Sequence, residues 1–454
     1  MRFRVGTARG SRPIARLGGW VTACAVVATA AIGPAGAETL NEALASAYLS
    51  NPTLLAARAE LRRTDEQVPQ ALAGWRPRVE VATGGGVAAS QGNNQRATLS
   101  SSSGAVYSVD LRVKQLIYNV ETPASIRQAE EAVQAERAHL TAVEQDVLTH
   151  AAAAYADVLR AQSVLQLNED HEREMARQLE SIRRRLSAGE LTRSDVAQAE
   201  ASLAQATAQR TRAAADILSA RAVYRAWVGH PPGALVEPGL PKNLPATEEE
   251  AAQGSAATPN VITANHAAKA AIHGVDVSRG LKLPQLLLQG EVGASSQSIL
   301  ALVSVPLYDG TLDPQIRGAK QLVEQRHLEA EAQQRTAREV AIGAWQNLVA
   351  AQAQIASYEA QVVAAQTAEE AVSHEQALGL RTVETLLSTR AQLLDARVSL
   401  TSARKDAFHA AIEVLASTGR LTARDLGLDV FQYDPEQHYN AVRGKWWGTD
   451  AEPR

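Results

Sequence analysis

The chain has 454 residues, a formal net charge of −4 and only 4% aromatic residues. So small a net charge gives no electrostatic basis for binding nucleic acid, and a single cysteine, Cys24, excludes an internal disulfide framework or a thiolate metal cluster. Few aromatic residues together with abundant Ala, Gln, Glu and Arg favour long helices packed along narrow seams over a thick globular core.

Residues 1–37 have the features of a secretory signal peptide. Several arginines precede a short apolar stretch from Trp20 to Ile32, and Ala35-Gly36-Ala37 provides an A-x-A-like cleavage site. We therefore expect cleavage before Glu38. One alternative is a retained membrane helix, but the apolar stretch is shorter than the roughly 20 residues that span a bilayer. The other is lipidation at Cys24, although most of the apolar stretch follows this residue.

The rest of the chain repeats itself. The stretch from Tyr118 to Gly229 aligns without a gap with the stretch from Tyr308 to Gly419. Upstream of these stretches the alignment continues after one insertion, which falls between Gly84 and Ser108. A long internal repeat of this kind determines the architecture before any local assignment is made.

The repeat predicts the domain boundaries. A first repeat is expected at 38–230, a linker rich in Pro, Gly and Glu at 231–258, and a second repeat at 259–420. Residues 421–454 are expected to form a short helix, from Leu421 to Leu426, and a polar tail.

Each repeat is expected to carry one β-hairpin. The hydrophobic period changes from 3.6 to 2 at about 78–84 and 106–116, and again at about 285–292 and 298–307. The glycines and polar residues from Gly84 to Gly104 have no packing pattern and predict a flexible loop. Each strand has one apolar face and one polar or charged face.

Such two-faced strands suit either a soluble sandwich or a membrane barrel. Their lengths are near the roughly 9–11 residues of a tilted membrane strand, and the helical remainder offers no partner for the apolar face. Four strands are too few to enclose a pore, so several chains would have to combine their hairpins. The residues expected on the lipid-facing side are Tyr107, Val109, Leu111, Val113, Ile299 and Val303. The residues expected on the lumen side are Asp110, Arg112, Lys114, Gln289 and Glu291.

Long antiparallel helical pairs are expected at 123–229 and 314–419. Apolar residues recur every seventh position, which is typical of helices wound around each other, and each region has one break, at Gly189 and at Gly379. The stretch from Ala124 to Ser187 alone would extend about 95 Å at 1.5 Å per residue. An ordinary core stripe is the alternative, but this length and the single central glycine argue against it.

No motif for catalysis emerges. His171-Glu172 lacks a second histidine one helical turn later, and Gly84-Gly85-Gly86 is not followed by Lys and Ser or Thr. No Gly-x-Ser-x-Gly sequence occurs. We therefore expect a protein that is not an enzyme and that uses no cofactor or metal.

Several short sequences carry a family resemblance in their order along the chain: Leu40-Asn41-Glu42-Ala43-Leu44 before Asn51-Pro52, Tyr118-Asn119, Gly189-x-x-Thr192-x-x-Asp195, Tyr308-Asp309 and Gly379-Leu380-Arg381-Thr382. On the basis of these sequences, the chain resembles the TolC-like outer membrane channel family over nearly all of its mature length. Asp434-Pro435 and Lys445-Trp446-Trp447-Gly448 further resemble members that serve protein-secretion systems.

The resemblance implies a homotrimer that combines twelve strands, four per chain, in one outer membrane barrel above a periplasmic tunnel of helices. It implies outer membrane lipid around the barrel, a periplasmic adaptor (membrane fusion) protein at the helix tips, and an inner membrane ABC or proton-driven transporter. The tip residues implied to contact the adaptor are Gly189, Thr192, Gly379 and Thr382.

The resemblance also implies a periplasmic gate made by polar contacts between neighbouring tips. Asp195 and Arg381 match positions that form such contacts, although both could be no more than solvated charges. Where some members place pore-facing acids, this chain has Thr385 and Ser388, and Glu384 is the nearest acid. A strong cation-attracting ring is therefore not expected.

The expected function is the exit duct of a type I protein secretion machine. The outer membrane component of a multidrug efflux pump is the first alternative. A periplasmic coiled-coil adaptor without a pore would explain the heptads but not the two-faced hairpins, and a soluble enzyme on a helical scaffold would lack a site.

Overall fold

The computed structural model describes residues 37–89, 103–241, 243–293 and 297–450. The expected signal peptide, apart from Ala37, lies outside the described residues, as do Cys24 and the tip of the first β-hairpin. Helices dominate the described part, accompanied by one small antiparallel sheet. The predicted fold class, mainly helical with four strands per chain, is therefore confirmed.

The described residues contain ten α-helices. Their bounds are α1 (Leu40–Ser50), α2 (Pro52–Asp65), α3 (Gln67–Leu72), α4 (Glu121–Ser187), α5 (Arg193–Val228), α6 (Glu248–Gly254), α7 (Pro259–Gly280), α8 (Leu312–Ala377), α9 (Val383–Ser417) and α10 (Pro435–Arg443). Single turns of 3-10 helix follow α3 at Ala73–Trp75 and α6 at Ser255–Ala257. Across the described residues, no helix is both long enough and apolar enough to cross a lipid bilayer.

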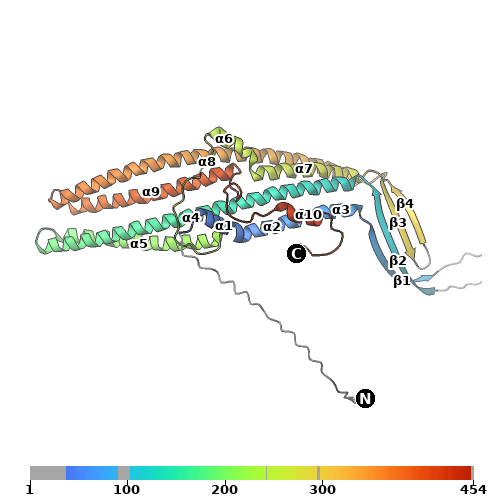
Figure 1. Cartoon of the computed structure of the whole chain (residues 1–454), viewed down its shortest axis with the longest axis horizontal. Coiled ribbons are helices and arrows are strands. Elements are labelled where there is room, and N and C mark those ends of the chain that lie inside the picture. The colour runs from blue at the N-terminus through green and yellow to red at the C-terminus, as the bar shows by residue number, and fades with distance from the viewer. Residues whose placement is uncertain (1–36, 90–102, 242, 294–296, 451–454) are drawn as a thin grey trace, which may run out of the picture. The chain divides into compact units, whose positions relative to one another are not determined.

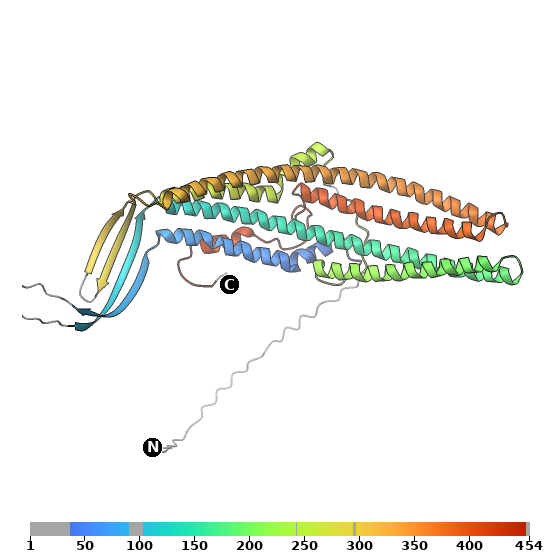
Figure 2. The same ribbon diagram turned by 180° about the vertical axis from the view of Figure 1, so that it is seen from behind.

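Most of the residues from 37 to 450 belong to two long helical hairpins, α4–α5 and α8–α9. Helix α4 has 67 residues and α8 has 66, so each is about 100 Å long at 1.5 Å per residue. Figures 1 and 2 show the α4–α5 and α8–α9 hairpins side by side, with their tips at one end and the sheet at the other. The sequence repeat thus becomes a structural repeat of two antiparallel helix pairs.

Local sequence explains why each hairpin turns where it does. Gly189 has a φ of 81° and Gly379 a φ of 77°, in the left-handed region that favours glycine after a helix. The next helix then starts at a threonine cap: the Thr192 hydroxyl accepts from the Asp195 backbone N–H, and the Thr382 hydroxyl from the Thr385 backbone N–H. A glycine stop and a threonine start, three residues apart, reverse the chain at both tips.

The four strands form one sheet in the order β1-β2-β3-β4, all antiparallel. Their bounds are β1 (Arg78–Ala89), β2 (Ser103–Tyr118), β3 (Gln285–Gly293) and β4 (Gln297–Ser304). Strands β2 and β3 come from different repeats, and their pairing joins the β1–β2 hairpin to the β3–β4 hairpin.

The first hairpin is longer than predicted. Residues Gly84–Ala89, which we expected in a flexible loop, pair in register with β2 as far as Ser103. A strand ladder is held by backbone hydrogen bonds, so glycines can continue it without any side-chain period. Strand β4, by contrast, ends at Ser304, three residues before the predicted end.

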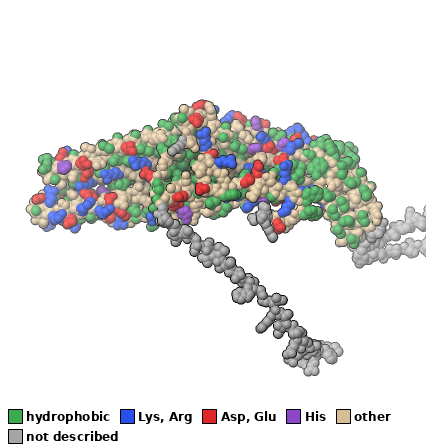
Figure 3. Space-filling view, in the orientation of Figure 1, with side chains coloured by type: hydrophobic (Ala, Val, Ile, Leu, Met, Phe, Trp, Pro, Cys, Tyr) green, Lys and Arg blue, Asp and Glu red, His purple; other side chains and the backbone are tan. Residues whose placement is uncertain are grey.

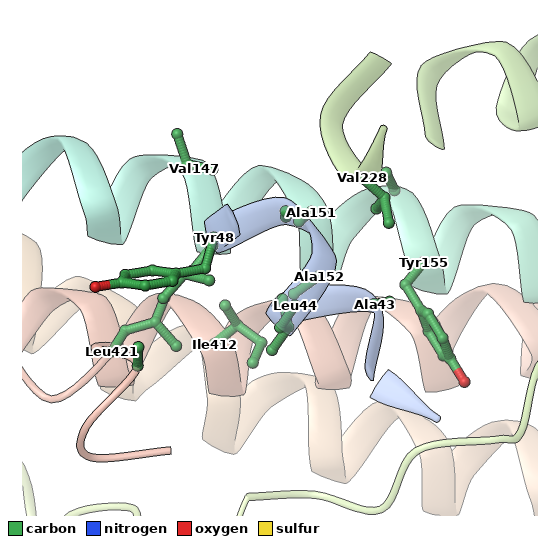
Figure 4. Packing of buried hydrophobic residues seen from close by; sticks show 14 of the residues in the cluster. Ala43, Leu44, Tyr48, Val147, Ala151, Ala152, Tyr155, Val228, Ile412 and Leu421 are labelled. Carbon is green, nitrogen blue, oxygen red and sulfur yellow. The ribbon is translucent and has the colours of Figure 1, made fainter. Parts of the chain in front are cut away.

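The main apolar cluster lies near the middle of the helical part, where α1, α4, α5, α9 and the turn around Leu421 meet. Leu44, Tyr48, Val147, Ile412 and Leu421 belong to it and are buried (Figure 4). Buried hydroxyls at its edge are satisfied by hydrogen bonds. The Tyr155 hydroxyl donates to the Val236 carbonyl oxygen at 2.6 Å, and the Tyr224 hydroxyl donates to a Glu38 carboxylate oxygen at 2.7 Å.

One smaller expectation needs correction. Leu421–Leu426 is not a helix: it forms hydrogen-bonded turns, and the C-terminal helix is α10 instead. Part of the expected linker is helical, because its three successive glutamates begin helix α6. Thr247 caps that helix, and acidic residues in a first helical turn are stabilised by the helix dipole.

Candidate functional site

The register of the sheet separates two sets of side chains. Arg112 lies opposite Glu291, and Lys114 lies opposite Gln289, so the predicted lumen residues share one face with Asp110. The register also places the following predicted lipid-facing residues together on the other face: Val109, Leu111, Val113, Ile299 and Val303. The side chain of Tyr107 lies outside the described part, although its backbone belongs to β2.

The apolar face is the more exposed of the two. Val79 is 60% exposed, Val81 67%, Ile299 81% and Val303 70%. On the polar face Arg112 and Glu291 form an ion pair at 3.3 Å, with side chains only 40% and 28% exposed. Figure 3 shows hydrophobic side chains gathered over the sheet end, away from the charged tips. A soluble protein has the opposite arrangement, so this sheet needs an apolar environment outside it.

Strand β4 differs from the other three strands. On the face that carries the charges of β2 and β3, it presents Ser298, Leu300, Leu302 and Ser304. Leu300 and Leu302 are 50% and 41% exposed. The charges that we predicted for the lumen therefore belong to β2 and β3, and β4 adds no charged side chain to this face.

Both edges of the sheet lack a partner strand within the described part of the chain, since β1 and β4 each pair on one side only. An open strand edge presents unpaired backbone N–H and C=O groups and is a template for another strand. In an apolar medium these groups must be satisfied, and closure into a barrel satisfies them.

At the first helix tip, Asp195 is bound within its own hairpin. The backbone N–H and the hydroxyl of Thr192 donate to one Asp195 carboxylate oxygen, at 2.8 and 2.7 Å. These two hydrogen bonds, the backbone bond first, hold the pKa of Asp195 below its usual value. Asp195 therefore stays a carboxylate at neutral pH and completes a capping box for α5.

At the second tip, Arg381 donates from Nε to a Glu375 carboxylate oxygen at 2.7 Å. Arg381 is exposed, and Glu384 is exposed in the first turn of α9. Among the described residues of this single chain, Asp195 forms no ion pair, so the structure does not bring the two predicted gate residues together. Each of them has a local partner that a contact between chains would have to complement or displace.

Sequence reasoning missed the polar cluster between the two hairpins. Arg390 of α9 donates from Nε to Glu369 of α8 at 2.9 Å, and its Nη1 lies 2.8 Å from Glu174 of α4. Its side chain is only 14% exposed. Arg390 lies four residues after Leu386 and three before Leu393, within the apolar heptad stripe. A charge in such a stripe was the available signal of an ion pair between helices.

The described residues include no group of three or more His, Cys, Asp or Glu placed to hold a metal ion. The polar residues of this region instead cap helices or pair across helix interfaces.

Comparisons with known proteins agree with this geometry. Residues 43–230 match the model of the outer membrane efflux protein family. The outer membrane efflux protein BepC of Brucella suis is 34% identical over 426 residues, covering 90% of this chain and 92% of BepC.

Solved structures share the fold. The outer membrane protein VceC of Vibrio cholerae superimposes with a TM-score of 0.74 at 20% identity, covering 84% of this chain and 96% of VceC. The CmeC outer membrane channel of Campylobacter jejuni gives 0.75 at 15% identity, covering 89% of each chain. With a relative this similar over nine-tenths of its length, the chain belongs to the outer membrane efflux protein family: it is a TolC-like outer membrane channel with a periplasmic helical part, and not an enzyme.

Proposed function

We propose that three copies of this chain combine their sheets into one barrel of twelve strands and their helical hairpins into one tunnel, forming the exit duct of an export machine. The observation that carries the proposal is the arrangement of the sheet: its apolar face is exposed, its charged face is half-buried and both of its edges are open. We call it the reversed sheet, because a soluble protein buries its apolar face instead. Three copies related by symmetry would pair β4 of one chain with β1 of the next, leaving no edge. The apolar face would then contact outer membrane lipid and the charged face would line the lumen.

In this duct the helix tips are the periplasmic end. Gly189, Thr192, Gly379 and Thr382 would contact a periplasmic adaptor, which docks on an inner membrane transporter. Both turns are exposed, and apart from the adjacent residues no described atom would lie within 4 Å of a Cβ on either glycine, so the turns are open to a partner.

The proposed cargo is protein, through a type I secretion machine with an ABC transporter. The segment Lys445-Trp446-Trp447-Gly448, which resembles secretion members, supports this choice. A second candidate is multidrug efflux with a proton-driven transporter, which the name of the relative BepC favours. Purification through a tag on this chain, with an inactive transporter to hold the complex, separates the two: an ATPase supports secretion, and a proton-driven pump supports efflux.

The proposed gate predicts the effect of replacing Arg381. If Arg381 holds neighbouring tips together through Asp195, Arg381→Ser should increase single-channel conductance in planar bilayers. Even about 1 kcal/mol per exposed contact, repeated three times, would shift the closed state measurably.

Glu375→Gln is the matched control. It removes the local partner of Arg381 without removing the guanidinium, so the conductance should stay low or fall. An unchanged conductance in Arg381→Ser would remove the gate hypothesis, whereas the absence of any channel in the unmodified protein would remove the proposed duct.

A further inference from the structure

The C-terminal segment after α9 returns along the helical part toward the sheet. Helix α10 is fixed there by polar contacts with two other helices and by apolar packing against a third. His438 Nδ1 lies 3.0 Å from an Asp65 carboxylate oxygen of α2, and Arg443 pairs with Glu130 of α4 at 3.1 Å. Tyr439 packs against the small cluster around Val68 of α3. The residues that follow α10 therefore start from a fixed position.

Beyond α10 the segment reaches the beginning of β1. Arg76, two residues before β1, donates from Nη1 to the Lys445 carbonyl oxygen at 2.8 Å, and its guanidinium carbon lies 5.1 Å from the centroid of the Trp446 ring. The preceding carbonyl, that of Trp75, accepts from the Gln115 amide of β2 at 2.7 Å. Trp446 is thus tied to the sheet through a chain of direct contacts.

Two large aromatic side chains are exposed at this point. Trp446 is 58% exposed and Trp447 is 85% exposed. Such exposure is unusual, because burying an aromatic side chain is strongly favourable. In the described part of the chain the Arg76 guanidinium covers only part of the Trp446 ring, and Trp447 is mostly exposed, so the pair needs an environment that the single chain does not provide.

The position of the pair indicates which environment that is. Strands β1 and β3 begin and strands β2 and β4 end at this end of the sheet. Tyr118 and Tyr308 are also exposed here, at 55% and 92%. Trp and Tyr concentrate at membrane–water boundaries, and outer membrane barrels carry aromatic girdles at both interfaces.

We propose that Trp446 and Trp447 insert into the periplasmic leaflet of the outer membrane and anchor the C-terminal segment to the lipid interface. The inference rests on the proposed membrane position of the sheet. The exposed apolar face begins at Val79, three residues after Arg76, so the pair lies beside the level at which the bilayer would start. Arg76 and Lys445 add cationic groups at the same place, which suit the phosphates of lipid headgroups. The partner is lipid, and a second copy of this chain is the competing occupant.

Fluorescence quenching tests the anchor. The full chain is reconstituted in phosphatidylethanolamine and phosphatidylglycerol vesicles whose acyl chains are brominated either near the headgroup or near the methyl end. The emission of the pair is the difference between the unmodified protein and the double variant Trp446→Phe, Trp447→Phe. We expect this difference to be quenched by the shallow bromines and much less by the deep ones.

Phe431→Trp is the matched control. Phe431 is 86% exposed on the same segment, but it lies near α1, where the Tyr433 backbone N–H donates to the Tyr48 hydroxyl. The emission added at position 431 should not be quenched by either lipid.

Two results would overturn the anchor. In both results neither bromine quenches the emission of the pair. Unquenched emission without a blue shift would place the pair in water, and unquenched emission with a blue shift would place it against protein, such as a second copy. Conductance of the same vesicles is measured in parallel. Missing conductance counts against the proposed duct alone, and the quenching decides the anchor separately.

Discussion

At the scale of single residues, the two helix tips differ at the third position of the following helix. Asp195 completes a reciprocal capping box with Thr192, whereas Thr385 provides only a neutral hydroxyl to Thr382, at 2.9 Å. The two tips therefore share a backbone geometry but differ in charge. Because the hydrogen bonds from Thr192 lower the pKa of Asp195, only the first tip has a cap that depends on ionisation.

This difference predicts an acid-sensitive first tip. The pKa of Asp195 in the folded protein is below its ordinary value of 3.8, so its contribution is present above that pH and is lost as the pH falls through the lowered pKa. Hydrogen exchange measured by mass spectrometry, corrected for intrinsic rates, should show the first turn of α5 opening with acid while the first turn of α9 stays unchanged.

Thr192→Ala should destabilise the start of α5 locally by about 1 kcal/mol and weaken its acid dependence, because the hydroxyl bond to Asp195 is lost while the backbone N–H of residue 192 still donates to the carboxylate. Thr382→Ala should destabilise the start of α9 by a similar amount at every pH. Equal acid sensitivity at the two tips would contradict the assignment.

At the scale of elements, the two helical hairpins are joined near their tips by an apolar cluster and by one cation that is only 14% exposed. Val383 and Leu387 of α9 pack with Met175, Leu179 and Ile182 of α4. Beside them Arg390 contacts Glu369 and Glu174, so a single guanidinium links α9 to both α8 and α4. Any separation of the hairpins must break this cluster.

Arg390→Met should therefore loosen the hairpins. It leaves the carboxylate of Glu369, which is 19% exposed, without its cation, at a cost of about 1–3 kcal/mol. Glu174 keeps its second partner, Arg177, at 2.7 Å. Native-state digestion with a protease that does not cleave at arginine measures the opening free energy of the tips. Arg404→Met is the control, because Arg404 pairs with Glu359 across α9 and α8 at 3.2 Å with both side chains about half exposed. It should cost less than about 1 kcal/mol, and an equal effect of the two variants would argue against a special role for Arg390.

At the scale of the whole molecule, the reversed sheet makes the isolated chain incomplete. An exposed apolar face and two open strand edges are stable only when other copies close the edges and lipid covers the face. The long helices carry exposed apolar residues as well, for example Leu218 of α5 and Val363 of α8, at 65% and 67%. The sheet and the long helices therefore both have surfaces that further copies of this chain could cover.

The two faces of the sheet should respond differently to the same charge. Ile299→Lys would be harmless on a water-exposed surface, but in lipid a lysine costs about 2–4 kcal/mol at the middle of the bilayer and less toward its borders. We expect less heat-modifiable trimer in outer membrane fractions. Gln289→Lys, on the opposite face, should leave the amount of trimer unchanged and shift ion selectivity toward anions. Loss of trimer in both variants, or in neither, would contradict the assigned faces.

Much of this architecture follows from local patterns in the sequence. The heptads, the glycines at 189 and 379 and the alternating strands act over a few residues, so the hairpins and the two faces of the sheet could be predicted. The glycine-rich end of β1 could not, because a backbone ladder leaves no side-chain period. The apolar residues of the turn at Leu421 predict a helix, but they pack into the main apolar cluster, whose other members lie far away in the sequence.

The repeat, the helical hairpins, the caps at their tips and the two faces of each strand depend on neighbours along the chain, so they can be derived from the amino-acid sequence. The pairing of β2 with β3, the contacts of Arg390 with both helical hairpins and the position of Trp446 beside Arg76 emerge only when the chain is folded. These contacts join residues far apart in the sequence, and the free energy that selects them comes from burial and charge pairing, which no local pattern records.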